Sequence, residues 1–185
     1  NNRNFFRLLL IGSSAEYGYS KKISLSEKDR LCPISNYGLV KSFQTKMMIY
    51  YFRKYNIDVL MARPFSFVNR DLPRSLLIGN LYNQIRKFKE NKIDKIELGN
   101  LDAYRDFIDV RKAVQYYIKI MEKGESGEIY NVGSGKPILL RDMCKKILKE
   151  ENIKIKYLRE NQEINSFSKD VKKIYANINK LKNLK

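Results

Sequence analysis

A tyrosine and a lysine at helical spacing are the residues of this sequence best suited to chemistry. Tyr37 and Lys41 lie four positions apart, which places their side chains on one face of a helix. A free tyrosine has a pKa of about 10 and is a poor acid or base near neutrality. A nearby ammonium favours the phenolate, and lowering the pKa to about 7 requires about 4 kcal/mol. With a serine hydroxyl on the same substrate oxygen, such a pair would interconvert a carbinol and a carbonyl group.

Ser13 and Ser14 are the candidates for that hydroxyl, and the pattern does not decide between them. The apolar run at 5–11 ends at Gly12 and predicts a buried parallel strand. Both serines then lie in the loop at the carboxyl end of this strand, where open α/β sheets bind ligands. Taken alone, Tyr-x-x-x-Lys also arises by chance as a solvated helix face, because the chain has 13 Tyr and 37 Lys plus Arg.

Length and composition predict a globular protein. The chain has 185 residues, of which 43% are hydrophobic, enough for one large domain or two small ones. No apolar run approaches the roughly 20 residues of a membrane span, and no signal peptide is evident, so we expect a cytoplasmic protein without membrane contact. The absence of histidine excludes a histidine base. Cys32 and Cys144 lack metal-ligand spacing, so no metal site is predicted.

The net charge of +17 has two interpretations. A strongly basic chain can bind nucleic acid, or its lysines can be solvated surface residues. The basic residues are scattered along the sequence, and no RNA-binding motif concentrates them. This disfavours nucleic acid as a partner and favours an anionic small molecule such as a diphosphate.

The order of the predicted elements indicates an α/β fold. Apolar residues recur at helical spacing over residues 37–55, and residues 59–62 form a short apolar strand. Strand, loop, helix and strand in this order favour parallel strands with helical crossovers. The helical apolar positions are Val40, Phe43, Met47, Tyr50 and Tyr51. The pattern further predicts helices near 77–88, 110–121 and 143–148, strands at 96–98 and 129–132, an edge strand at 154–158, and a polar surface segment at 21–35.

Five segments carry an ordered series of motifs. They are Ser-Ser-Ala-Glu-Tyr-Gly at 13–18, the segment 33–42 with Tyr-Gly-Leu-Val-Lys, Arg-Pro-Phe at 63–65, Arg-Asp-Phe-Ile-Asp-Val at 105–110, and Gly-Glu-Ile-Tyr-Asn-Val-Gly-Ser-Gly at 127–135. Together they resemble the extended short-chain dehydrogenases that act on nucleotide sugars, the NAD-dependent epimerase/dehydratase family. The resemblance implies the C-terminal part of a Rossmann-type doubly wound parallel sheet plus a smaller α/β substrate-binding region. Residues 1–70 would form the cofactor side with Ser, Tyr and Lys, and residues 71–185 mainly the substrate side, with 127–136 returning to the sheet.

The resemblance also implies roles for individual residues. NADPH or NADH would deliver hydride to a keto group of a nucleotide-sugar substrate while Tyr37 protonates the oxygen, assisted by Lys41 and by Ser13 or Ser14. The residues implied in cofactor binding are Tyr37, Lys41, Pro64 and Phe65, and those implied in substrate binding are Ser66, Asn100 and Arg105. For Arg105 two roles stay open, a contact with the diphosphate or ribose and a surface salt bridge with Asp106 or Asp109. Asp109 is expected to cap the following helix.

Within the family, residues 99–106 are most similar to enzymes of GDP-linked deoxy sugars, above all the GDP-4-dehydro-6-deoxy-mannose reductases. The related 4,6-dehydratases carry a glutamate two residues before the Tyr-Gly at 17–18, where this chain has Ala15. Glu16 is displaced by one position and is expected to point elsewhere. The resemblance therefore favours a reductase or a 4-epimerase over a dehydratase.

The chain departs from the family pattern in two places. No Gly-x-x-Gly-x-x-Gly turn precedes residue 5, so we expect the sequence to begin near the fifth core strand of the family. Ser66 and the pair at 69–70 replace the usual Asn and Gly-Pro, which puts sugar contacts by this loop in question. Three interpretations follow: a piece of a complete reductase, which we favour, a non-catalytic module that binds a nucleotide sugar or a partner chain, or a basic sheet that binds nucleic acid. An open sheet edge at 5–11 predicts dimerisation or poor solubility of this chain alone, and we expect a homodimer.

Overall fold

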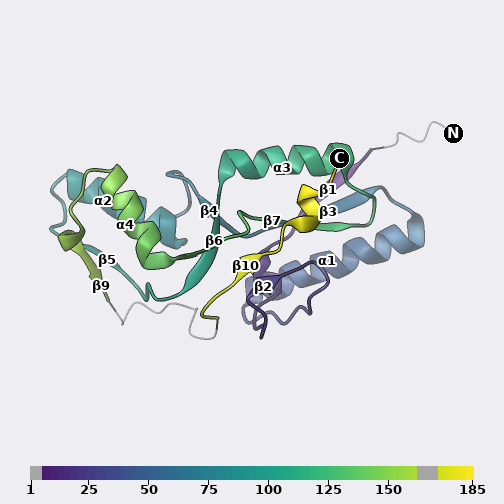
Figure 1. The fold of residues 1–185 in the computed structure, drawn as a ribbon, viewed down its shortest axis with the longest axis horizontal. Coiled ribbons are helices and arrows are strands. Elements are labelled where there is room, and N and C mark those ends of the chain that lie inside the picture. The colour runs from purple at the N-terminus through teal and green to yellow at the C-terminus, as the bar shows by residue number, and fades with distance from the viewer. Residues whose placement is uncertain (1–5, 162–170) are drawn as a thin grey trace.

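A three-stranded parallel sheet is the centre of the first of two lobes in the computed structural model, which describes residues 6–161 and 171–185 (Figure 1). Its order is β1-β3-β7. The strands are β1 (Leu8–Ile11), β3 (Val59–Pro64) and β7 (Ile129–Val132). β3 pairs in parallel with both neighbours. The predicted parallel sheet is thereby confirmed.

Two helices cover opposite faces of this sheet (Figure 1). They are α1 (Asn36–Tyr55) and α3 (Val110–Lys123). Successive side chains of a strand point to opposite faces, and the side chains of β3 divide accordingly. Leu60 and Ala62 pack in the cluster that contains Ala113 and Ile120 of α3. Val59 and Met61 pack in another cluster with α1. Burial on both faces explains why this strand reads as a continuous apolar run.

β1 differs from the sequence prediction in its burial. It pairs with β3 in parallel as expected, but it lies at the edge of the sheet within the described residues. Leu8 is 41% exposed and Ile11 is 37% exposed, so the expected burial of this strand is wrong. The predicted strand also included Phe5, which lies outside the described residues. An open edge offers unpaired backbone groups to another strand.

The predicted helix α1 is confirmed, but its apolar stripe faces outward. The stripe consists of Val40, Phe43, Met47, Tyr50 and Tyr51, all of them exposed. The residues that α1 buries are mostly small or polar: Gly38, Ser42, Thr45 and Met48. Small side chains on the inner face bring α1 close to the structure beneath it, and a Cβ on Gly38 would lie 2.4 Å from the Ala15 carbonyl oxygen.

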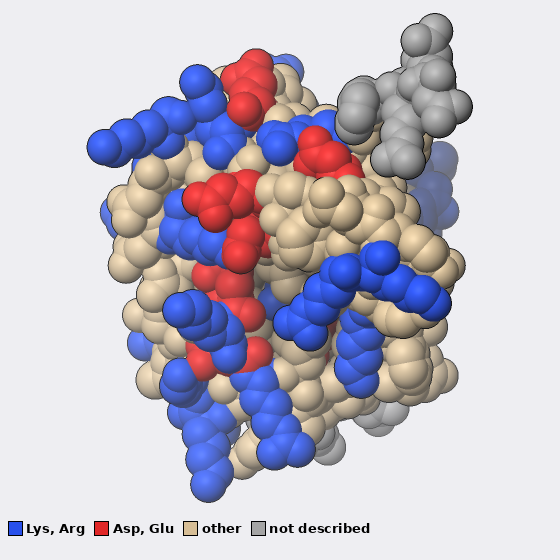
Figure 2. Space-filling model, turned by 90° about the vertical axis from the view of Figure 1, so that its right-hand side faces the viewer, with Lys and Arg blue, Asp and Glu red and all other residues tan. Residues whose placement is uncertain are grey.

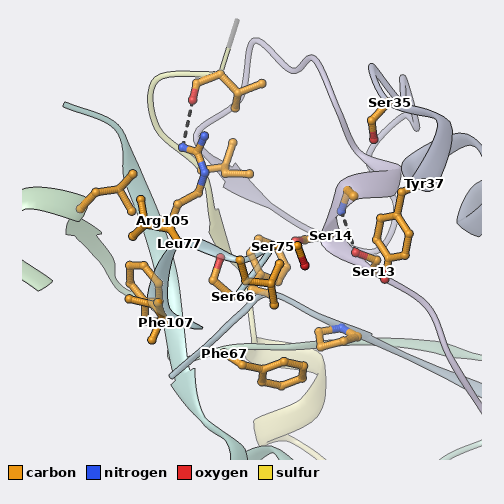
Figure 3. A pocket seen from close by; sticks show the side chains of 18 of the residues that line it. Ser13, Ser14, Ser35, Tyr37, Ser66, Phe67, Ser75, Leu77, Arg105 and Phe107 are labelled. Carbon is orange, nitrogen blue, oxygen red and sulfur yellow. Dashed lines mark hydrogen bonds between the residues drawn. The ribbon is translucent and has the colours of Figure 1, made fainter. Parts of the chain in front are cut away.

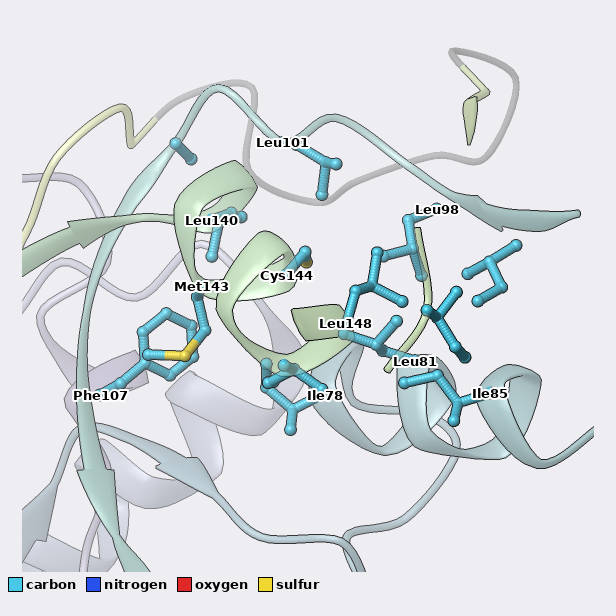
Figure 4. Close-up of a cluster of buried hydrophobic side chains, with 14 residues drawn as sticks. Ile78, Leu81, Ile85, Leu98, Leu101, Phe107, Leu140, Met143, Cys144 and Leu148 are labelled. Carbon is cyan, nitrogen blue, oxygen red and sulfur yellow. The ribbon is translucent and has the colours of Figure 1, made fainter. Parts of the chain in front are cut away.

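The second lobe is built from two helices and a pair of strands around one apolar cluster (Figure 4). These elements are α2 (Leu77–Lys89), β5 (Ile96–Leu98), α4 (Leu140–Glu150) and β9 (Leu158–Glu160), with the 3₁₀ turn η2 (Ile155–Tyr157) before β9. α2 contributes Ile78, Leu81 and Ile85, whose spacing is that of one helix face. The edge strand predicted at 154–158 is wrong in its bounds, because a 3₁₀ turn occupies most of that segment.

Short strands join the two lobes. β4 (Ser66–Val68), β6 (Tyr104–Asp109) and β8 (Pro137–Leu139) form a sheet in the order β4-β6-β8, and β2 (Ser24–Leu25) pairs with β10 (Tyr175–Ala176). The short helix α5 (Asn179–Lys182) follows β10. Leu25 is fully buried, so the segment 21–35 is not only the surface segment that the sequence predicted. Strands of two or three residues are too short to show an alternating pattern.

The charged side chains are distributed over the surface. On the face shown in Figure 2, Lys and Arg side chains project at several separate places, with Asp and Glu side chains between them. Several of the charged side chains form ion pairs, for example Arg7 with Asp58. Among the residues that the structure describes, no helix combines the length and apolar character needed to cross a membrane.

The two cysteines are expected to differ in reactivity. Cys32 is exposed and Cys144 is buried. Burial raises the pKa of the Cys144 thiol to about 12, because the thiolate would lose its hydration. At about pH 8, close to the ordinary thiol pKa, iodoacetamide should therefore modify Cys32 and leave Cys144 intact. Mass spectrometry of the folded and the urea-unfolded chain checks this, and equal labelling of both cysteines in the folded chain would contradict the packing of α4.

Candidate active site

A cavity of about 680 Å³ lies between the two lobes and brings most of the predicted site residues together. Its wall includes the turn after β1, the start of α1, the link between β3 and β4, the start of α2 and part of β6. The predicted residues on this wall are Ser13, Ser14, Tyr37, Pro64, Phe65, Ser66, Asn100 and Arg105. Figure 3 draws Ser13, Ser14 and Tyr37 on one side of the cavity and Arg105 with Phe107 on the other. Lys41 is the one predicted residue that does not line it.

Tyr37 and Lys41 occupy the first turns of α1. Ser35 caps this helix by accepting a hydrogen bond from the Gly38 N–H at 3.1 Å. The Lys41 Nζ lies 5.9 Å from the centroid of the Tyr37 ring, so the expected proximity of the two side chains is present. Lys41 Nζ also donates to the Ile11 carbonyl oxygen at 2.7 Å. This bond ties the helix to the carboxyl end of β1, where the serines follow.

Ser13 begins a single 3₁₀ turn, η1 (Ser14–Glu16), that directly follows β1. Its Oγ accepts a hydrogen bond from the Ala15 N–H at 3.2 Å. The Ser13 N–H in turn donates to Glu16 Oε1 at 2.8 Å, which completes a capping box. A serine hydroxyl that accepts one hydrogen bond keeps its own hydrogen as a donor, so Ser13 can still donate into the cavity.

Glu16 points away from the cavity, as the sequence predicted. It is fully buried, and its Oε2 accepts hydrogen bonds from Thr45 Oγ1 at 2.5 Å and from Arg63 Nη2 at 3.0 Å. Burial alone would lower the pKa of Arg63, but the nearby Tyr17 and Glu16 raise it, so the guanidinium stays charged. Tyr17 Oη accepts from Arg63 and donates to Asn131 Oδ1 at 2.7 Å.

Arg105 is half-buried and has no acidic partner among the described residues. Its Nη1 donates to the carbonyl oxygens of Tyr104 at 2.7 Å and Val171 at 2.9 Å. Burial lowers the pKa of the guanidinium, and none of the carboxylates that the structure describes offsets this. The salt bridge with Asp106 or Asp109 is therefore excluded.

The two aspartates near Arg105 have structural partners instead. Asp106 is fully buried and accepts hydrogen bonds from the backbone N–H groups of Ser134, Gly135 and Ala176. Asp109 caps α3 by accepting bonds from the first N–H groups of that helix, as the sequence predicted. Arg105 is left as a half-buried cation on a cavity wall, without an acidic partner in the described part of the chain.

Several cavity residues were not predicted from the sequence. Arg74 supplies a second cation on the wall, and Phe67 and Phe107 supply aromatic rings. No sequence pattern marks Arg74 or Phe67, because the fold alone brings their segments together, and the motif that contains Phe107 did not predict its place on the wall. The position of Glu16, by contrast, could have been predicted from the sequence. Ser-x-x-Glu is the capping-box pattern, in which the glutamate side chain turns back toward the serine.

Comparison with known proteins places these features in one family. The family model for GDP-mannose 4,6 dehydratase matches residues 1–183. A GDP-6-deoxy-D-mannose reductase of Pseudomonas aeruginosa is 28% identical over 138 residues, 73% of this chain and 45% of the relative. The solved structure of RMD from Pseudomonas aeruginosa in complex with NADPH superposes with a TM-score of 0.84 at 22% identity, covering 95% of this chain and 58% of that one. A dTDP-glucose 4,6-dehydratase of Bacillus anthracis in complex with NAD gives 0.83 at 19% identity, covering 96% of this chain and 55% of that one.

These matches confirm the resemblance and the α/β fold inferred from the motifs. The chain spans less than half the length of the curated relatives that it matches, for example 45% of the reductase and 41% of a UDP-arabinose 4-epimerase of Arabidopsis thaliana. The relatives are nucleotide-sugar reductases, epimerases and dehydratases. With a family model matched over nearly all of its residues, the chain belongs to the GDP-mannose 4,6 dehydratase family of nucleotide-sugar enzymes.

Proposed function

We propose that this chain is the catalytic and substrate-binding part of an NAD(P)H-dependent reductase of a nucleotide-linked 4-keto-6-deoxyhexose, with GDP as the favoured nucleotide. The observation that carries this proposal is the cavity, which has Ser13 and Tyr37 on one side and Arg105, unpaired with any described carboxylate, on the other. None of the described residues on its wall is acidic, and Arg74 adds a second positive charge. Such a wall suits an anionic diphosphate with a sugar carbonyl held near the tyrosine.

The proposed chemistry assigns one task to each residue. Tyr37 donates its phenolic proton to the carbonyl oxygen as that oxygen gains negative charge. Ser13 donates a hydrogen bond to the same oxygen, and the positive charge of Lys41 stabilises the phenolate that remains. Arg105 binds the diphosphate. General acid catalysis of this kind contributes roughly 10²- to 10⁴-fold to the rate.

The residues proposed for the cofactor fit one end of a nicotinamide nucleotide. Tyr37, Pro64 and Phe65 share the cavity wall, and the ammonium of Lys41 is fixed beside them by the Ile11 carbonyl. A bound NADPH or NADH would supply the hydride. We further propose that residues 1–70, with 127–136, form this cofactor side, and that the rest forms mainly the substrate side.

The lack of acidic side chains among the described wall residues also bears on the alternative functions. A 4,6-dehydratase must remove one proton and protonate a leaving hydroxyl, but Ala15 lines the cavity where an acid would be needed and Glu16 is buried behind it. A 4-epimerase remains a second candidate, because it uses the same Ser, Tyr and Lys and because UDP-arabinose 4-epimerases are among the relatives.

Consumption of NADPH distinguishes these functions. A reductase consumes one NADPH for each keto sugar, whereas an epimerase regenerates its cofactor and shows no net consumption. The chain should be mixed with NADPH and GDP-4-keto-6-deoxymannose, and the absorbance of NADPH followed. Steady consumption supports the reductase. Exchange between C4 epimers of a nucleotide sugar without consumption would support the epimerase, and nucleotide-sugar binding without turnover would support a non-catalytic module.

We also propose that the protein forms a homodimer through the outer face of α1. Val40 is 65% exposed, Met47 is 58% exposed, and Phe43, Tyr50, Tyr51 and Tyr55 are exposed beside them. Six such side chains, each about half exposed, present on the order of 600 Å². A standard interface buries roughly 800 Å² per partner, so this face supplies most of what a dimer needs.

A charge placed in this face should separate the dimer. We expect Met47→Asp to yield a monomer, because association would bury an unpaired carboxylate. Ile155→Asp is the matched control, since Ile155 is similarly exposed at 49% but lies in the second lobe. Light scattering after gel filtration measures both. A wild-type monomer, or a Met47→Asp dimer, would contradict the interface.

A further inference from the structure

A buried cluster beneath the cavity joins the serine and the tyrosine of the proposed site. The cluster consists of Glu16, Thr45 and Arg63, each at most 2% exposed. Glu16 lies on the turn after β1, Thr45 on α1 and Arg63 on β3. One carboxylate therefore contacts the turn that begins at Ser13, the helix that carries Tyr37, and the central strand of the sheet.

The position of Thr45 makes this contact relevant to catalysis. Tyr37, Lys41 and Thr45 are spaced four residues apart, so they follow one another along the same side of α1, from the exposed Tyr37 to the buried Thr45. Glu16 Oε2 accepts from Thr45 Oγ1 at 2.5 Å, while Glu16 Oε1 accepts from the Ser13 N–H at 2.8 Å. The carboxylate thus bridges the backbone of Ser13 and the helix face of Tyr37.

Gly12 and Arg63 pack tightly against the Glu16 carboxylate. A Cβ on Gly12 would lie 2.5 Å from Glu16 Oε1, so glycine is required there while the carboxylate keeps its place. Arg63 fixes the other side of the carboxylate through its Nη2 at 3.0 Å. A buried ion pair adds little net stability, because desolvation offsets most of the attraction. Its effect on geometry is therefore the more distinctive contribution.

We propose that Glu16 is a positioning residue that holds Ser13 in register with Tyr37 for proton transfer. It touches neither substrate nor cofactor and acts through Ser13. The inference rests on the proposed function, since it assigns Glu16 a role in the reaction of that same cavity. A misplacement of about 1 Å in such a pair can lower the rate about 10²-fold.

The first test uses Glu16→Gln, which keeps the shape of the side chain. An amide has one acceptor oxygen, so it cannot accept from Ser13 on one side and from Thr45 and Arg63 on the other. We expect kcat to fall about 10²-fold with little change in KM. Glu151→Gln is the matched control, because Glu151 is 9% exposed and pairs with Lys89 and Arg70 in the second lobe.

Repeating the Glu16→Gln substitution in a Ser13→Ala chain separates an effect on the position of Ser13 from an effect on the stability of the fold. If Glu16 acts through the Ser13 hydroxyl, Glu16→Gln should have almost no further effect on kcat in a Ser13→Ala chain. An equal loss in both backgrounds would overturn the inference. Because Glu16→Gln leaves Arg63 buried without its partner, the paired change of Glu16 and Arg63 to Met serves as a second variant. It should keep a melting temperature near that of the wild type and still lose kcat.

Hydrogen exchange tests the bridge without turnover. Peptides covering residues 12–18 should exchange faster in Glu16→Gln than in the wild type or in Glu151→Gln, because the single amide oxygen is held by the charged Arg63 and the Ser13 N–H loses its acceptor. Unchanged exchange would overturn the inference, whatever the activity. If exchange rises as expected but the wild type does not reduce a keto sugar, the proposed function fails while the bridge between Ser13 and α1 stands.

Discussion

Replacing Tyr37 with phenylalanine is expected to lower kcat for keto-sugar reduction by about 10²- to 10⁴-fold. The substitution removes only the phenolic oxygen, which is the proposed proton donor. Tyr37 is 58% exposed at the start of α1 and belongs to none of the buried clusters, so the fold should be unaffected. The KM for the nucleotide sugar should change little, because Arg105 lies on the other side of the cavity. NADPH consumption at saturating substrate measures the effect.

Tyr19→Phe is the control for this prediction. Tyr19 is similarly exposed, at 53%, but it does not line the cavity. Removing its hydroxyl should leave kcat unchanged. A Tyr37→Phe chain that retains more than about a tenth of the wild-type rate would show that another group supplies the proton.

The second large effect is expected at Arg105. Exchange for methionine keeps the length and apolar stem of the side chain but removes the positive charge from the cavity wall. Charge-assisted hydrogen bonds contribute about 1.5 to 3 kcal/mol each. The dissociation constant for GDP-mannose should therefore rise about 10- to 100-fold, since each 1.4 kcal/mol is a factor of about ten. Isothermal titration calorimetry measures this directly.

Two further variants make the Arg105 result specific. Arg105→Lys keeps the charge but loses the planar fork that matches phosphate oxygens, so binding should be intermediate. Arg86→Met removes one positive charge from the exposed side of α2, outside the cavity. It should leave affinity unchanged. Equal weakening by Arg86→Met and Arg105→Met would mean that net charge, and not the cavity, attracts the ligand.

The sequence predicted the larger elements of the fold well and the smaller ones poorly. α2 was predictable because Leu81 and Ile85 repeat with its period and pack in one cluster. β3 was predictable because it is buried on both faces. The exposure of Leu8 in β1 and of the apolar stripe of α1 depends on which elements pack against them. The periodicity of the sequence does not show which elements those are. β2 and β10 consist of two residues each, which is too few for a pattern.

In the candidate site, too, some features could be predicted from the sequence and others could not. Tyr37 and Lys41 could be paired from their spacing, and the motifs placed Ser13 and Arg105 in the same family site. Whether Arg105 had a carboxylate partner could not be predicted, because Asp106 is adjacent in sequence but turns to the backbone of Ser134. Arg74 lies in the turn before α2 and lines the cavity, which no pattern in its own segment predicts.

Transfer of deuterium from labelled NADPH tests the central claim most directly. The chain should be incubated with NADPH deuterated at the transferred position and with GDP-4-keto-6-deoxymannose, and the product analysed by mass spectrometry. We predict a nucleotide-linked deoxyhexose that carries deuterium at C4 in the wild type and almost none in Tyr37→Phe. Binding of the nucleotide sugar with no deuterated product in the wild type would contradict the assignment of this chain as a reductase.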